Sequence, residues 1–141
     1  MKKSKLIFLF LPGALLALAV LISAQVPFDD YFLDQALRID LFQAGDAKEE
    51  TLTIHQVYQE GTWPESKLGL ISPFEYGRYV YRLYDIASNR LILSRGFDTM
   101  FAEYKTTSPA LAGVKRVFQR SVRIPLPKRP VLFVVERRDK R

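Results

Sequence analysis

Alternating apolar and polar residues define the first two predicted strands. Residues 37–42 read Leu-Arg-Ile-Asp-Leu-Phe, which places Leu37, Ile39 and Leu41 on one face of an extended chain. A polar turn follows, and residues 51–58 alternate again and are rich in β-branched side chains. Two such segments joined by a short polar turn predict an antiparallel hairpin.

A second hairpin is predicted from residues 77–85 and 90–95. The first of these segments alternates tyrosine and leucine with basic residues and is the strongest strand pattern in the chain. The Ser-Asn pair at 88–89 supplies the turn, because asparagine and serine favour tight turns. The segment at 90–95 then returns along the first strand.

The last third of the chain predicts a short helical turn at 107–112, with a proline at its first helical position, and two further strands. Residues 116–124 form the longer strand, which the proline-rich stretch 125–130 should break. Residues 131–135 are a continuous apolar run, which is typical of a central strand covered on both faces. The whole pattern predicts an all-β fold of two packed sheets.

Residues 1–24 are predicted to be a signal peptide helix, and residues 25–141 one β-sandwich domain. Three lysines precede a long apolar stretch, and small residues end it at Ala24, where cleavage is expected. The chain is therefore expected to be exported to the periplasm, the cell envelope or the medium. The alternative is an uncleaved anchor, since the apolar stretch approaches the length of a membrane span. Any membrane contact would then involve only this segment.

Composition excludes several functions. The net charge of +6 falls to +3 without the three N-terminal lysines, which is too little to indicate a nucleic-acid partner. The chain has no cysteine, and His55 is its only histidine. It therefore lacks the residues that a typical zinc site or a catalytic triad needs. The adjacent acids Asp29 and Asp30 have no calcium-loop pattern. We therefore expect no catalytic residue, no cofactor and no metal.

The stretch from Ser94 to Thr107 concentrates charge, glycine and aromatics behind an apolar strand. Gly96 indicates a bend, a bulge or the close approach of another backbone. We expect Arg95 and Glu103 to make internal polar contacts. The three aromatics Phe97, Phe101 and Tyr104 are expected to close the core. These six structural residues are Arg95, Gly96, Phe97, Phe101, Glu103 and Tyr104.

Three aromatic residues outside this stretch are candidates for facing a ligand: Trp63, Tyr76 and Tyr84. Trp63 lies in a long connection rich in proline and glycine, where it could stack on a sugar. The interpretation that we favour for Trp63 is that it plugs one end of the core.

Five segments of the chain, in order and with compatible spacing, resemble the N-terminal non-catalytic domain of the IgA-peptidase family of secreted zinc metallopeptidases, metallopeptidase family sixty-four. They are Phe28 to Phe32, Leu37 to Asp40, Gly77 to Asp85, Ser94 to Thr107 and Phe118 to Lys128. The Ser-Arg-Gly-Phe block is the most specific of them. Three positions depart from the pattern: Leu93 replaces a tyrosine, Tyr104 a tryptophan and Arg120 an acid.

The resemblance implies an immunoglobulin-like β-sandwich that precedes a peptidase domain, whose zinc-binding motif has no counterpart here. We expect a non-catalytic accessory domain that serves docking or substrate positioning. Its partner would be a peptidase domain that is encoded separately or has been lost. The alternatives are an independent module that binds a glycan or a protein, and a small anchored envelope protein.

Overall fold

A computed structural model describes residues 25–74 and 76–138 of the chain. The signal peptide helix predicted for residues 1–24 lies outside the described residues. Within them the elements are, in order, α2 Phe28–Tyr31, β1 Phe32–Gly45, β2 Glu50–Gln59, β3 Tyr79–Asp85, β4 Arg90–Phe97, α3 Phe101–Tyr104, α4 Ser108–Leu111, β5 Arg116–Pro127 and β6 Val131–Arg137.

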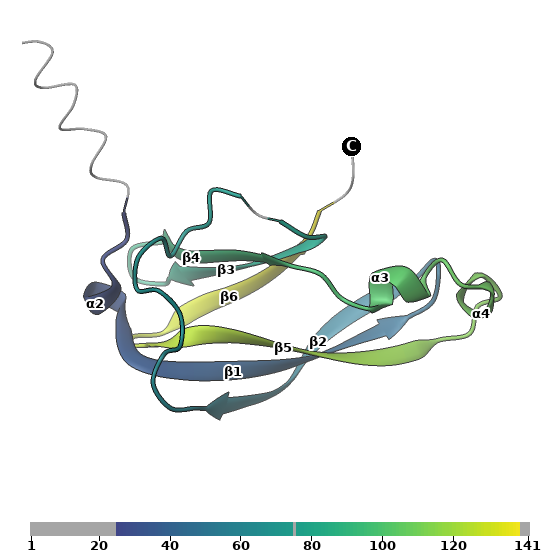
Figure 1. Ribbon diagram of the computed structural model, residues 1–141, viewed down its shortest axis with the longest axis horizontal. Helices are drawn as coiled ribbons and strands as arrows, with labels where there is room; N and C mark the ends of the chain where they lie inside the picture. Colours follow the sequence, from purple (N-terminus) through teal and green to yellow (C-terminus); the bar gives the residue numbers. More distant parts are fainter. Residues whose placement is uncertain (1–24, 75, 139–141) are drawn as a thin grey trace, which may run out of the picture.

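The described strands form two antiparallel sheets that pack face to face (Figure 1). The long sheet has the order β2-β1-β5, and the short sheet has the order β4-β3-β6. Both predicted hairpins are confirmed, since β1 pairs with β2 and β3 pairs with β4. The predicted all-β sandwich is confirmed as well, whereas its immunoglobulin-like connectivity stays a prediction.

The core lies between the two sheets and follows the alternation of β1 and β3. Ile39 and Leu41 of β1 are buried against Tyr79, Tyr81 and Leu83 of β3 in one apolar cluster. Because alternate residues of a strand point to opposite faces, this inward set leaves the intervening polar residues of β1 on the outer face.

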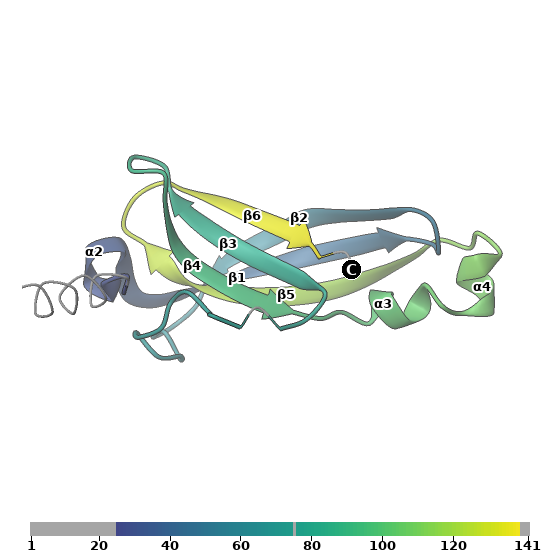
Figure 2. The same cartoon turned by 90° about the horizontal axis from the view of Figure 1, so that it is seen from above.

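The long sheet extends well beyond the short one (Figure 2). At its far end α3 and α4 take the place of the second sheet. Phe101, Tyr104 and Ala110 form a second buried cluster there, with Phe118 of β5 packed against it. The molecule therefore covers one continuous inner face with two different layers, and the boundary between these layers positions the site described below.

The strand β6 corrects the prediction for residues 131–135. The run lies at the edge of the short sheet and pairs only with β3 among the described strands, so it is not a central strand. Leu132 on its outer side is 52% exposed. The central strand is β3, in which Tyr79, Val80 and Tyr81 are all buried. An apolar run alone does not tell a central strand from an edge strand whose inner side chains reach the core.

The proline-rich stretch does not break β5 where expected. The strand continues to Pro127, and Pro125 and Pro127 lie opposite Ala36 and Phe32 of β1. The register of the two strands shifts between Leu33 and Ala36. Proline is tolerated at such an irregular pairing because its missing N–H is not needed for a regular ladder.

Two other predictions concern short helices and the membrane. The helical turn expected near 107–112 is present as α4, with proline in its first turn. The turn α3 was not predicted. Over residues 25–74 and 76–138 the structure contains no helix with the length and apolar character needed to cross a membrane.

Candidate interaction site

A cleft opens between the end of the short sheet and α3. Its larger part is a groove of about 790 Å³ lined by Gly77, Arg78, Asp98, Ala102, Glu103, Thr106 and Arg138. An adjoining pocket of about 250 Å³ shares Asp98 and Glu103 with the groove. Gln43 of β1 and Phe118 of β5 also line this pocket. We call the groove and the pocket together the α3 cleft.

Close backbone packing fixes one wall of the cleft. A Cβ atom on Gly96 would overlap the backbone carbonyl of Tyr76, so the segment before β3 lies directly on β4. Gly77 follows with φ of +95°, a conformation that favours glycine. The backbone N–H of Arg78 then donates to Oδ1 of Asp98 at 2.7 Å. These contacts hold the segment at 76–78 against the residues that lead into α3.

A buried carboxylate joins the layers beside the cleft. The Glu50 side chain, 7% exposed, accepts hydrogen bonds from the hydroxyl of Tyr79 at 2.5 Å and from Nε2 of Gln43 at 2.8 Å. It also pairs with Lys105 at 3.1 Å and with Arg137 at 3.4 Å. One group therefore ties β2 to β1, to both β3 and β6 of the short sheet, and to Lys105, the residue that follows α3.

The network shifts two pKa values in opposite directions. Burial raises the pKa of the Glu50 carboxyl, but hydrogen bonds from Tyr79, Lys105 and Gln43 outweigh it, so the net shift is downward. For Tyr79, burial and then the hydrogen bond to Glu50 raise the pKa to about 12. Glu50 therefore carries its charge, and Tyr79 stays protonated as a donor, at neutral pH.

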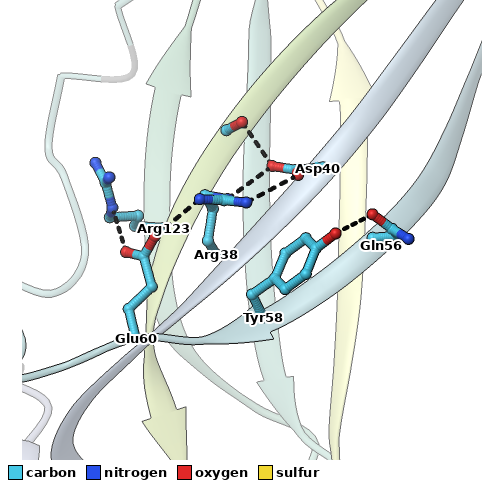
Figure 3. Close-up of polar contacts among 7 residues, drawn as sticks. Arg38, Asp40, Gln56, Tyr58, Glu60 and Arg123 are labelled. Carbon is cyan, nitrogen blue, oxygen red and sulfur yellow. Dashed lines mark hydrogen bonds and ion pairs between the residues drawn. The ribbon is translucent and has the colours of Figure 1, made fainter.

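The outer face of the long sheet carries a second polar cluster (Figure 3). Arg38 bridges Asp40 at 3.1 Å and Glu60 at 3.3 Å, and Arg123 pairs with Glu60 at 2.7 Å. The hydrogen bond from Ser121 and the contacts with Arg38 lower the pKa of Asp40. Each of these charged side chains is paired with one of opposite sign, so the cluster is neutral overall. The α3 cleft is therefore the better candidate for a binding site.

The structure places most of the residues singled out between Ser94 and Thr107 inside the domain. Phe97 lies in the main core, and Phe101 and Tyr104 lie in the second cluster. The Arg95 guanidinium donates to the carbonyls of Gly69 at 3.1 Å and Leu70 at 2.7 Å.

Glu103 corrects that interpretation. Its side chain is exposed and lines the α3 cleft instead of making internal polar contacts. Residues three apart on a helical turn share a face, so Phe101 and Tyr104 both point inward, and Glu103 then points outward.

The three candidate ligand-facing aromatics differ in exposure. Trp63 is only 5% exposed and belongs to the main core, which excludes it as an exposed aromatic platform. Its position agrees with the core plug that we favoured. Tyr84 is half-buried on β3. Tyr76 is 76% exposed and stacks on Phe74, with ring centroids 5.8 Å apart, so it is available to a ligand.

Sequence reasoning missed the residues that build the network: Gln43, Glu50, Lys105 and Arg137. One signal was available. The inward alternation of Leu37, Ile39 and Leu41 continues to position 43, where glutamine takes the next apolar position. A polar side chain that faces a core needs hydrogen-bond partners. The identity of those partners depends on tertiary pairing that the alternation does not encode.

The described part of the chain has no group of three or more His, Cys, Asp or Glu side chains suited to a metal ion. His55 lies on the exposed strand β2, where its ring stacks on Phe42 at 4.2 Å. The α3 cleft is lined mainly by charged and hydrogen-bonding side chains, which suit recognition of another molecule.

Comparison with known proteins identifies the family of this chain. A comparison with curated proteins found no match. A family model described as the peptidase M64 N-terminus matches residues 27–141, which include every strand of the sandwich and both parts of the α3 cleft. The chain belongs to the family of peptidase M64 N-terminal domains.

Proposed function

We propose that this domain docks a peptidase domain of its family at the α3 cleft and thereby positions the peptidase or its substrate. The observation that carries the proposal is where the last strand ends. The strand β6 ends at Arg137, and Arg138 lines the groove. The backbone N–H of Arg138 donates to the carbonyl of Arg78 at 2.8 Å. In a protein where a peptidase domain follows this one, the chain therefore leaves the domain at the cleft.

The rim of the cleft has the composition of a protein-binding surface. Met100 lines its pocket and is 66% exposed, and Tyr76 immediately precedes the groove residue Gly77. Arg78 and Arg138 line the groove. Methionine, tyrosine and arginine are enriched in protein interfaces, where large side chains bury area and arginine adds hydrogen bonds. A peptidase domain supplied by another chain would meet the same surface.

Replacing Met100 with alanine is expected to weaken the complex with a peptidase M64 catalytic domain encoded in the same genome. The truncation removes the contact area of a large exposed side chain at the rim, which should raise the Kd about tenfold. Isothermal titration calorimetry measures the effect, and equal melting temperatures of variant and parent exclude unfolding.

Leu68→Ala is the matched control, because Leu68 is 69% exposed and lies beside Phe28 in a different pocket. Its Kd should equal that of the parent. The docking proposal is wrong if the parent forms no complex, or if the two variants weaken the complex equally.

A second candidate function is an independent glycan-binding module. It is favoured by the stacked pair of Phe74 and Tyr76, residues that are 65% and 76% exposed and whose ring planes are inclined at 21°. Exposed rings that lie nearly parallel to each other offer an apolar face to the C–H groups of a sugar. Tyr76→Ala should then abolish binding on a glycan array. Tyr58→Ala, at an exposed position of β2, should leave binding unchanged. Equal binding by both variants and the parent would contradict this function.

A further inference from the structure

The pocket of the α3 cleft contains two buried oxygens without hydrogen-bond partners among the described residues. They are Oε1 of Gln43 and Oγ1 of Thr99, and both residues line the pocket. Gln43 is only 1% exposed. A buried oxygen without a partner costs free energy, because it has lost its hydrogen bonds to water. Both residues would gain from a ligand that donates.

The orientation of the Gln43 amide follows from its neighbours. Its nitrogen faces Oε1 of Glu50 at 2.8 Å and the hydroxyl of Tyr79 at 2.7 Å. The carboxylate of Glu50 can only accept, so the amide must present its N–H groups there and turn its oxygen away. The buried network thereby fixes an acceptor at the pocket.

The other charged side chains that line the pocket are mostly negative. Asp98 and Glu103 are exposed carboxylates at the wall of the pocket, and Phe118 contributes an aromatic ring. Arg120 is the one cation among the described lining residues of this pocket. Two acids, an amide oxygen and a hydroxyl form a set that accepts hydrogen bonds, next to a ring that can stack on a flat cation.

We infer that this pocket binds the guanidinium group of an arginine side chain from a polypeptide that docks in the α3 cleft. The inference rests on the proposed docking function and names the chemistry of the partner. Arginine supplies several N–H donors in one plane, so a single group can donate to a carboxylate and to a neutral oxygen while its face lies on an aromatic ring. The charge of Arg120 opposes such a ligand and limits its affinity.

The test titrates the full chain with N-acetyl-arginine amide and follows backbone and glutamine side-chain resonances by NMR. The matched probe is N-acetyl-citrulline amide, which has the same shape without the charge. We expect saturable shifts at Gln43, Thr99 and Glu103 with the arginine probe, and a citrulline affinity at least tenfold lower. Equal affinities, or no binding of the arginine probe, would overturn the inference.

Charge substitutions at the pocket should change the affinity in opposite directions. Glu103→Gln removes an acceptor charge from an exposed position and should weaken binding about fivefold. Arg120→Gln removes the opposing charge and should strengthen binding about threefold. Glu136→Gln, an exposed acid on β6 outside the pocket, should have no effect. Binding that is insensitive to both pocket variants would contradict the inference.

Thr99→Val separates a ligand-binding role from a structural one. Valine keeps the shape of threonine and removes the hydroxyl. If Oγ1 has no partner in the free protein, the melting temperature should stay equal or rise while arginine binding weakens. A lower melting temperature with unchanged binding would show that the hydroxyl serves the fold and would overturn its place in the site.

The outcome also distinguishes this inference from the proposed function. If the peptidase domain docks and Met100→Ala weakens the complex, but the arginine probe does not bind, docking stands and the arginine pocket is wrong. If the arginine probe binds but no complex with the peptidase domain forms, the pocket exists and its proposed use in docking is wrong.

Discussion

Replacing Gly96 with alanine is expected to lower the free energy of unfolding by about 3 kcal/mol. The added Cβ would overlap the carbonyl oxygen, the carbonyl carbon and the amide nitrogen of Tyr76. All three are backbone atoms, so no side-chain rotation relieves the overlap, and the segment before β3 must move away from β4. Equilibrium unfolding in urea measures the change.

Gly61→Ala is the control for this prediction. A Cβ on Gly61 has no heavy atom within 4 Å, and its φ lies outside the left-handed region. The substitution should therefore be neutral or stabilise the fold slightly, since alanine reduces the entropy of the unfolded chain. Similar losses of stability in both variants would show that the close approach of Tyr76 to β4 does not carry the effect.

The Gly96 substitution should also disturb the α3 cleft. The displaced segment includes Gly77 and Arg78, which line the groove and are held to Asp98. Docking should consequently weaken in Gly96→Ala even at temperatures where the variant is folded. The most specific block of the family resemblance thus contributes to the site through Gly96. This glycine allows the segment before β3 to pack directly on the backbone of β4.

Most of the fold was predictable because alternation reports directly which residues face the core. The hairpins followed from the alternation of β1 to β4 and from their polar turns. The position of β6 did not follow, because an apolar run records burial and not sheet order. The turn α3 has four residues, too few to produce a helical period in the sequence.

The candidate site was less predictable than the fold, since it depends on residues far apart in sequence. Gln43 and Glu50 come from the first hairpin, and Lys105 and Arg137 from later elements. The sequence located the segment that contains Glu103 but assigned its side chain to the interior. A charge among aromatics signals a constrained segment, and only the local helical geometry decides which way that charge points.

Replacing Glu50 with glutamine is expected to lower the free energy of unfolding by about 2 kcal/mol at pH 7. Removing one partner of a buried ion pair leaves the other charge without compensation, which costs about 3 to 5 kcal/mol in closed interiors. The side chains of Lys105 and Arg137 are 13% and 45% exposed, so water compensates part of this loss. Urea unfolding measures the change, and Glu49→Gln is the control because Glu49 pairs with Lys115 on the surface.

The pH dependence gives this prediction a second, independent readout. The folded pKa of Glu50 lies below its ordinary value of 4.5, so its stabilisation is fully present above that value and is lost as the pH falls through the folded pKa. Glu50→Gln removes this titrating group, and its loss of stability relative to the parent should shrink in acid. The contrary result is a stability difference between parent and variant that stays constant from pH 7 to about pH 3. It would mean that packing at the boundary beside the cleft, and not the charge of Glu50, joins the layers.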